Sequence, residues 1–226
     1  MSKGRIFLIA VYALVLLVGV GLIIGGGTLL WANHFMKDSE GFYTTRSVEV
    51  QRDSYAITSY PAEIEIEHIW ILDWLKSIEI KLTAKNNDDK GVFVGIAPEE
   101  DLQKYLSGVE HDRIDELDLN HPIGEPEITY RNFPGTSSPK APTNIDFWTA
   151  SASGAGEQVL RWGLESGTYS VALMNQDGSA GVDINAAVGA KVPIMAGIGL
   201  WLAIAGIALI LLSFFLLYVT VTRSEI

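Results

Sequence analysis

Residues Val192 to Thr222 read VPIMAGIGLWLAIAGIALILLSFFLLYVTVT and carry no charged side chain over about 30 residues. A helix needs about 20 consecutive apolar residues to cross the hydrocarbon core of a bilayer. A similar stretch, Ile6 to Met36, opens the chain, and its only residue that titrates near neutral pH is His34. We therefore expect two transmembrane helices, at residues 6–32 and 193–221, which bracket one polar domain at residues 37–190.

Basic residues at the chain ends predict the orientation of the two helices. Lys3 and Arg5 precede the first apolar stretch, and positively charged flanks stay in the cytoplasm. Two spans then return the C-terminus to the same side. We expect residues 1–5 and 222–226 to be cytoplasmic and the central domain to be extracytoplasmic. The alternative is a cleaved signal peptide, but the first stretch is about twice the usual length and ends without a small-residue cleavage motif.

Small residues predict where the two apolar stretches contact each other. Gly21 and Gly25 form a GxxxG motif, and Gly199 and Ala203 lie at a similar depth in the second stretch. Small side chains let two helices approach closely in lipid. The motif also suits docking of another protein's helix, and glycine is common in membrane helices whatever its role. Neither stretch contains Asp, Glu, Lys or Arg, which disfavours an ion-transporting helix pair.

Charge and cysteine content exclude several functions. The chain has a formal net charge of −11 and its ends are slightly positive, so the central domain is strongly acidic. Nucleic-acid binding needs clustered Lys and Arg, and we expect none here. The chain has no cysteine, which excludes disulfides, thiol catalysis and cysteine-ligated metal centres.

Alternation of apolar and polar residues predicts β-strands through the central domain. The clearest case is Ser77 to Lys85, and other strand-like runs cover residues 47–51, 62–70, 92–96, 127–133, 147–153, 158–164, 168–174 and 182–188. One short helix is expected at residues 98–106, because Pro98 opens it, three acidic residues follow, and Gly108 ends it. The expected fold is mainly β: an antiparallel, jelly-roll-like β-sandwich flanked by two transmembrane helices.

Three segments resemble a family of two-span bacterial membrane proteins that is frequent in actinobacteria. They read VFVGIAPEEDLQKYLSGVEHDRI, DFWTASASG and GTYSVALMNQDGSAGVDI, and the shared motifs fall at residues 93–111, 146–154 and 169–182. The resemblance implies the two-span topology with an extracytoplasmic domain, and it implies no activity. The last strands also resemble the jelly-roll modules of secreted peptidases, although a fold does not by itself give a function.

Two acidic stretches are weak candidates for a metal site. His111, Asp115, Asp118 and His121 offer imidazole and carboxylate ligands for a divalent cation. Their spacing matches no established metal-binding loop, so a solvated turn is the simpler explanation. The stretch NQDGSAGVD at residues 175–183 lacks the ligand periodicity of an EF-hand, and a hairpin turn with Gly178 at positive φ explains it.

Three further patterns have a functional and a simpler structural explanation. Glutamates at 63, 65 and 67 suggest acid–base chemistry or, more simply, a solvated edge strand. His68 suggests a pH sensor or, more simply, a core histidine. Four tryptophans suggest a platform for a sugar or peptide or, more simply, core packing; they are Trp70, Trp74, Trp148 and Trp162.

No nucleophile elbow, phosphate loop or dinucleotide-binding fingerprint is present, so we expect no enzymatic activity and no cofactor. The leading hypothesis is a membrane-anchored accessory protein that presents its β-sandwich to a partner at the cell envelope. Its expected partners are the lipid bilayer and a membrane protein or a second copy of the chain. The alternative hypothesis is a ligand-binding or sensing domain for a carbohydrate, a peptide or a divalent cation.

Overall fold

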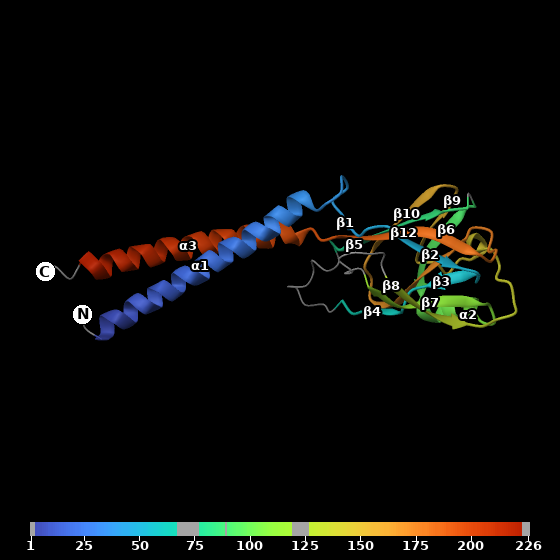
Figure 1. Cartoon of the computed structure of the whole chain (residues 1–226), viewed down its shortest axis with the longest axis horizontal. Helices are drawn as coiled ribbons and strands as arrows, with labels where there is room; N and C mark the ends of the chain where they lie inside the picture. The colour runs from blue at the N-terminus through green and yellow to red at the C-terminus, as the bar shows by residue number, and fades with distance from the viewer. Residues whose placement is uncertain (1–2, 67–76, 89, 119–126, 223–226) are drawn as a thin grey trace. The chain divides into compact units, whose positions relative to one another are not determined.

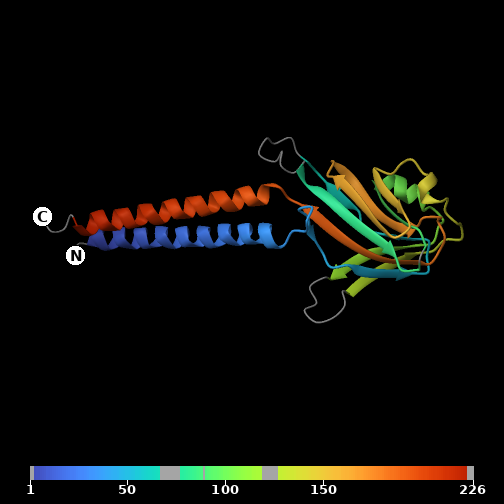
Figure 2. The same ribbon diagram turned by 90° about the horizontal axis from the view of Figure 1, so that it is seen from above.

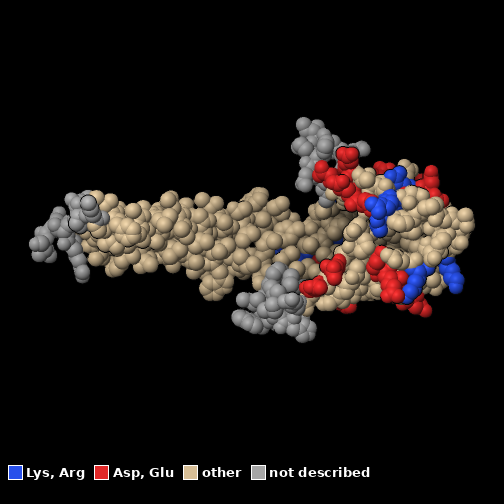
Figure 3. Space-filling view, turned by 90° about the horizontal axis from the view of Figure 1, so that it is seen from below, with Lys and Arg blue, Asp and Glu red and all other residues tan. Residues whose placement is uncertain are grey.

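The computed structural model describes residues 3–66, 77–88, 90–118 and 127–222 (Figure 1). The chain divides into two compact units: Met1–Glu40 together with Val192–Ile226, and Gly41–Lys191. We call the first the helical unit and the second the two-sheet domain. On the face shown in Figure 3, the acidic and basic side chains gather on the two-sheet domain, and the two long helices show none.

The helical unit is a pair of long helices, α1 (Lys3–Phe35) and α3 (Ile194–Thr222). The helices lie side by side in both ribbon views (Figures 1 and 2). The segments Ile6–Phe35 and Ile194–Thr222 are each long and apolar enough to cross a membrane. Many of their large apolar side chains are exposed on the outside of the pair. Such a continuous apolar surface is typical of a protein that lipid or a partner covers.

Small residues at every seventh position form the contact between α1 and α3. Gly19 and Gly26 are buried in α1, and Gly199, Gly206 and Ser213 are buried in α3. A Cβ atom added at Gly26 would lie 2.6 Å from the carbonyl oxygen of Gly199, and one at Gly206 would lie 2.6 Å from that of Gly19. The two antiparallel backbones therefore touch. A repeat of seven is the period that keeps one face of each helix toward its partner.

The hydroxyl of Ser213 continues this contact toward the chain ends. Its Oγ donates a hydrogen bond to the backbone carbonyl of Tyr12 at 2.6 Å. Interhelical hydrogen bonds of this kind stabilise helix pairs in an apolar environment, where no water competes for the donor. Tyr12 lies seven residues before Gly19, as Ser213 lies seven residues after Gly206.

The expected helix contact differs from the observed one in α1. A Cβ atom added at Gly26 would lie 2.7 Å from the backbone nitrogen of Ala203, so Gly199 and Ala203 both lie at the contact. Gly21 and Gly25 do not, because both are exposed and an added Cβ meets nothing within 4 Å. The prediction chose glycines four residues apart, whereas a contact that follows two helices selects every seventh residue.

The two-sheet domain contains two β-sheets with short helices outside them. The first sheet has the order β1 (Tyr43–Thr44), β12 (Val182–Lys191), β5 (Glu79–Asn86), β10 (Glu157–Gly163), and β2 (Val48–Arg52) also pairs with β12. The second has the order β8 (Glu127–Phe133), β7 (His111–Asp118), β3 (Ala56–Thr58), β11 (Gly167–Asn175), β6 (Val92–Pro98), β9 (Ala150–Gly154), and β4 (Ala62–Ile64) also pairs with β11. The helices are α2 (Glu99–Tyr105) and the 3₁₀ turn η2 (Pro142–Asn144).

The mainly β character is confirmed, and three strands, β1, β3 and β7, are additions to the expected set. β3 is buried along its whole length, so its sequence shows no alternation. β7 reads HDRIDELD, which resembles a solvated turn. β3 and β7 pair in parallel, so the expected purely antiparallel arrangement is wrong at this pair. The expected strand 62–70 is seen as β4 up to Ile64, and its residues 67–70 lie outside the described part. A jelly-roll order of strands stays a prediction.

Two hydrophobic cores hold the domain together. The main core lies between the two sheets and contains Val50, Ile57, Leu82, Val94, Leu173 and Ile184. The smaller core lies on the other face of the second sheet, where Leu102 and Leu106 contact Phe93 and Met174. β6 is buried on both faces by these two cores, which explains its unbroken apolar run.

The turn expected after β11 is present, but it is not the turn of a hairpin, because β11 and β12 belong to different sheets and the loop crosses from one to the other. Gly178 has φ of 76°, and its N–H donates to the carbonyl of Asn175. The buried amide of Asn175 donates to the carbonyls of the next turn at Ser179, Ala180 and Gly181. Asp177 accepts a hydrogen bond from the backbone N–H of Ser179, and this bond lowers the pKa of the Asp177 carboxyl. The polar groups of this loop thus find their hydrogen-bond partners within the protein.

Candidate functional site

An apolar cavity of about 500 Å³ lies between the two sheets. Its walls are mainly aliphatic side chains from both sheets, among them Val48, Val50, Leu82, Ile57, Val94 and Leu173. Protein interiors are normally close-packed, with few voids larger than a water molecule. Ligand sites typically measure about 300–1,000 Å³ and are lined mostly by apolar side chains. The size and lining of this cavity therefore fit a ligand site better than a packing defect.

The cavity forms because small side chains face each other on one side of the domain. Sheets that pack face to face lie about 10 Å apart, and side chains must fill that space. On the β10 side, Trp162 and Tyr169 fill it, with ring centroids 4.8 Å apart. Among the described residues that line the cavity, Tyr60 is the one aromatic, and valine, isoleucine and leucine are the commonest apolar residues. Those short side chains leave the gap unfilled.

The two sheets are joined on one side of the domain and separate on the other. β9 pairs with β6 in the second sheet, and β10, which follows it directly in the chain, pairs with β5 in the first. This crossing closes that side. The opposite edges of the sheets are formed by β2 and β8. Arg52 of β2 lies 3.7 Å from the centre of the Tyr130 ring of β8, which links these edges through a cation–π contact.

The cavity is open to solvent along one side, and its buried and exposed lining residues lie close together, since Ile128 pairs directly with Leu117. Val50 and Ile128 line it, and the Arg52–Tyr130 contact lies two residues further along the same strands. Ile57 and Val94 are 1% and 0% exposed, so they are packed against other atoms and no water-sized space borders them. The lining residues Leu117 and Val188 are 42% and 46% exposed, and Tyr60 is 63% exposed. We call the residues Thr45, Tyr60, Leu117 and Val188 the mouth.

The mouth lies at the end of the domain where the chain enters and leaves. β1, which opens the domain, pairs Tyr43 with Ala190 and Thr44 with Gly189, next to Val188 of the mouth. β12 ends at Lys191, and the apolar helix α3 begins at Ile194. The exposed rim of an apolar cavity is therefore only a few residues from a candidate membrane span along the chain.

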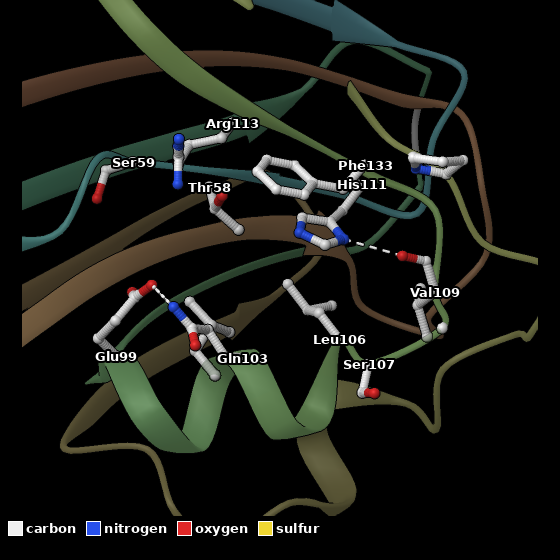
Figure 4. Close-up of a pocket in the computed structure, with 13 residues that line it drawn as sticks. Thr58, Ser59, Glu99, Gln103, Leu106, Ser107, Val109, His111, Arg113 and Phe133 are labelled. Carbon is white, nitrogen blue, oxygen red and sulfur yellow. Dashed lines mark hydrogen bonds between the residues drawn. The ribbon is translucent and has the colours of Figure 1, made fainter. Parts of the chain in front are cut away.

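A second pocket, of about 400 Å³, lies beside α2 on the outer face of the second sheet (Figure 4). His111 stacks on Phe133 with ring centroids 4.9 Å apart, and the Arg113 guanidinium lies 5.1 Å from the centre of the same ring. The Nδ1 atom of His111 is 2.9 Å from the carbonyl of Val109 (Figure 4). A carbonyl only accepts, so the proton lies on Nδ1 and Nε2 is the free acceptor of the neutral ring.

The charged groups of this second pocket have partners within the protein. Glu99 accepts hydrogen bonds from Gln103 at 2.6 Å and from the hydroxyl of Ser170. Arg113 donates from Nε to Asp115 at 3.1 Å. The bond from Ser170 ties α2 to β11 of the second sheet, whereas the Arg113–Asp115 contact lies within β7. A structural role explains these contacts.

The structure separates the residues predicted as metal ligands. Asp115 forms ion pairs with Arg113 at 3.1 Å and Arg131 at 2.7 Å, and His111 is engaged with Phe133 and Val109. Asp118 ends β7, and His121 lies outside the described residues. Within the part of the chain that the structure describes, no three His, Asp or Glu side chains are arranged to hold a metal ion.

The other patterns singled out in the sequence do not assemble into one site. Glu63 and Glu65 are exposed, and Glu67, His68, Trp70 and Trp74 lie outside the described residues. Trp148 contacts Phe93 in the core under α2, with ring centroids 4.8 Å apart. Trp162 belongs to the main core. Of the four tryptophans singled out in the sequence, the two that the structure describes are therefore core residues in different cores.

Comparison with known proteins finds no protein-family model that matches the chain, no similar curated protein and no similar solved structure. The resemblance to a two-span bacterial family stays a prediction. Some residues of the cavity were predicted as apolar strand faces, and those on β3 and β7 were not predicted as strand residues. The void itself was not predicted, because it depends on the distance between two sheets and has no pattern along the chain. Function is therefore argued from the cavity.

Proposed function

We propose that this protein is a membrane-anchored, extracytoplasmic domain that binds an apolar ligand between its two sheets without transforming it. The observation that carries the proposal is the cavity of about 500 Å³, aliphatic in its lining and open along one side. A ligand that fills it replaces water against apolar walls, which is the main favourable contribution to binding of apolar molecules.

The two apolar helices support this function by anchoring the domain. In the proposal, α1 and α3 both cross the membrane, the chain ends lie in the cytoplasm, and the two-sheet domain faces outward as a β-sandwich. An anchored domain stays next to the bilayer, where apolar molecules concentrate. Because the local concentration of ligand is then high, very tight binding is not required.

The lining of the cavity favours an apolar ligand over those expected from the sequence. A carbohydrate or a peptide needs hydrogen-bond partners for its many polar groups, because a buried polar group without a partner is costly. The deep residues Val50, Ile57 and Val94 offer none. A cation needs several carboxylates, and of the two that line the cavity, Asp115 and Glu116, the first is already paired with two arginines.

Binding of radiolabelled hexadecanol to the full-length protein in nanodiscs tests the proposal. We expect the parent protein to retain the label above empty nanodiscs, and Val188→Arg at the mouth to lower retention at least tenfold. Val159→Arg is the matched control, because Val159 is also a strand valine of the first sheet, is 40% exposed and does not line the cavity. Equal retention by the parent and Val188→Arg, or none by the parent, contradicts the proposal.

The accessory role that the sequence favours stays a prediction with its own test. Purification of the full-length protein in mild detergent, followed by mass spectrometry, identifies proteins that accompany it. A stoichiometric membrane partner supports an accessory subunit. A lone monomer or a homo-oligomer argues against it.

A further inference from the structure

We infer that the pocket beside α2 binds a small zwitterion, an α-amino acid, between Arg113 and Glu99. This second site goes beyond the proposed function, because the pocket lies on the outer face of the second sheet and the cavity lies between the sheets. Three observations carry the inference: the two opposite charges in the lining, a buried hydroxyl without a partner between them, and the spacing of the strands that hold them.

The lining of this pocket contains one charge of each sign. Among the described lining residues, Arg113 of β7 is the one that is always cationic, and Glu99 at the start of α2 is the one carboxylate. Figure 4 shows Glu99 on the helix at one side of the pocket and Arg113 on the sheet at the other. A ligand with both an ammonium and a carboxylate group complements the two charges.

The guanidinium of Arg113 is held in place and leaves part of its donors unused. Its Nε donates to Asp115 at 3.1 Å. The group lies 5.2 Å from the centre of the Tyr60 ring and 5.1 Å from that of Phe133. Neither Nη atom donates a hydrogen bond to a residue that the structure describes. A fixed guanidinium fork is the preferred partner of a carboxylate group.

The carboxylate of Glu99 is also held in place and keeps acceptor capacity. It accepts hydrogen bonds from the Gln103 amide at 2.6 Å and from the hydroxyl of Ser170. An ionised carboxylate offers about four lone-pair sites. The sites that remain can accept the N–H groups of an ammonium ion.

Thr58 lies between the two charged residues. It is the register partner of Arg113 on β7 and of Ala172 on β11. Ser170, which donates to Glu99, shares a strand face with Ala172 because the two are two residues apart. Thr58 is 5% exposed and lines the pocket, and its hydroxyl bonds to none of the described residues. A buried hydroxyl without a partner is costly, so a polar ligand at this place supplies what the protein does not.

The spacing of the strands fits the length of an α-amino acid. Neighbouring strands lie about 4.8 Å apart, so β7 and β11, which flank β3, are separated by about 10 Å. One extended residue spans about 3.5 Å, and a hydrogen bond at each end adds about 3 Å. The sum is about 9 Å. The pocket of about 400 Å³ has the volume of about 13 water molecules, which leaves room for a side chain.

Isothermal titration calorimetry of the full-length protein in nanodiscs tests the inference. The probes are the standard L-amino acids, added one at a time. We expect at least one to bind with a Kd below about 1 mM. The N-acetyl derivative of that amino acid lacks the ammonium group, and its amide lacks the carboxylate. Each derivative should bind about tenfold more weakly or worse, because each loses a hydrogen bond to a charged group.

Charge variants assign each end of the ligand to its residue. Glu99→Gln keeps the shape and removes the charge, so it should weaken binding of the amino acid about tenfold and leave that of the N-acetyl derivative unchanged. Arg113→Gln should weaken binding of the amino acid and leave that of the amide unchanged. A purely structural role would weaken all three probes alike. If Arg113→Gln does not fold, the Glu99→Gln comparison still decides the inference.

Thr58→Val tests the hydroxyl between the charges, because valine keeps the volume and removes the donor. It should weaken binding of the amino acid about fivefold or more. Thr129→Val is the matched control, since Thr129 is also a strand threonine of the second sheet, is exposed and does not line the pocket. It should leave the affinity unchanged.

The outcomes separate this site from the proposed function. No binding of any amino acid up to about 10 mM overturns the inference. An N-acetyl derivative that binds as tightly as its amino acid overturns it too, because the pocket would then recognise a plain carboxylate. Unchanged binding by both Glu99→Gln and Thr58→Val places the ligand elsewhere and overturns it as well. Glu99 does not line the cavity between the sheets, so Glu99→Gln should retain hexadecanol as the parent protein does.

Discussion

At the scale of single residues, side-chain volume decides both the helix contact and the cavity. Gly26 has no room for one methyl group, whereas Ala186 faces a space that several methyl groups would fill. Both positions lie within regular structure, so propensity does not distinguish them from their neighbours. Each position is therefore tested by a substitution that adds carbon atoms. Its effect on stability is compared with that of the same substitution at a nearby residue of the same type.

Adding a methyl group at Gly26 should separate the two long helices. Its Cβ would lie 2.6 Å from the carbonyl oxygen of Gly199, which is backbone and cannot rotate away. We expect Gly26→Ala to destabilise the helix pair by about 1–3 kcal/mol, as overpacking usually does. Thermal unfolding of the full-length protein in mild detergent measures the effect. Gly25→Ala is the control, since an added Cβ there meets nothing within 4 Å; equal effects of the two variants would refute the contact.

Adding carbon atoms at Ala186 should stabilise the unliganded domain. Ala186 lines the cavity, so Ala186→Val buries two more carbons there and adds about 1 kcal/mol to the free energy of unfolding. Ala84 is its direct neighbour across the strand pair and is fully buried, but it does not line the cavity. We expect Ala84→Val to cost about 1–3 kcal/mol through overpacking. Urea unfolding followed by tryptophan fluorescence compares them, and destabilisation by both would argue against an open cavity.

At the scale of elements, local sequence signals determine where α2 begins, and tertiary contacts determine where it lies on the second sheet. Pro98 and the acidic first turn predict a helix over residues 98–106, and the observed helix covers Glu99–Tyr105, with Pro98 as its N-cap and one residue shorter at each end. Its position on the second sheet depends on distant residues. The hydroxyl of Tyr105 donates to the carbonyl of Lys140 at 2.6 Å, and Leu102 enters the core beneath the helix.

The anchoring of α2 by Tyr105 should be lost at high pH. Burial raises the pKa of Tyr105 from 10.0 to about 12. Because the folded-state pKa is the higher one, this contribution to stability is complete below pH 10 and is lost as the pH rises from 10 to 12. Tyr105→Phe should lower the free energy of unfolding by about 1 kcal/mol at pH 8 through the lost hydrogen bond.

The decisive comparison for Tyr105 is the slope of stability against pH. Between pH 10 and pH 12, Tyr105→Phe should lose less stability than the parent protein. Burial also raises the pKa of Tyr130, but that residue is the same in both proteins and cancels in the comparison. Urea unfolding at pH 8, 10, 11 and 12 measures the slopes. Equal slopes for the parent protein and Tyr105→Phe would show that the Tyr105 phenol does not contribute to the pH dependence of stability.

At the scale of the whole molecule, the chain is two units with different surroundings. The helical unit exposes apolar side chains, and the two-sheet domain carries the acidic surface. Both ends of the domain are tied to each other, because β1 and the end of β12 pair next to the two connections. Such a domain has its own core and closes on itself, which lets it fold as a unit.

The orientation in the membrane is tested with single cysteines, since the chain has none of its own. Ser151 is exposed on β9, so a membrane-impermeant maleimide should label Ser151→Cys in intact spheroplasts. It should label Ser224→Cys only after permeabilisation, because the positive flank of the first span keeps the chain ends inside. Labelling of Ser224→Cys in intact spheroplasts would place the chain ends outside and remove the extracytoplasmic assignment.

The sequence by itself determined the features that depend on near neighbours. Two uninterrupted apolar runs specify α1 and α3, and alternation specifies strands such as β5 and β8 nearly to their ends. These signals are local, because hydropathy and period reflect the side chains along one segment. These local signals miss a short strand that is buried throughout, such as β3, and a strand rich in charged residues, such as β7.

Tertiary structure alone decided the features that depend on distances between segments. The sequence suggested Gly21 and Gly25 for the helix contact, and the structure uses Gly19 and Gly26, because the partner helix selects which face is buried. The cavity follows from valines and alanines on β2, β12, β6 and β11 that face one another across the sheets. Each of those residues is an ordinary core residue in its own strand. Only their common spacing leaves a gap between the sheets.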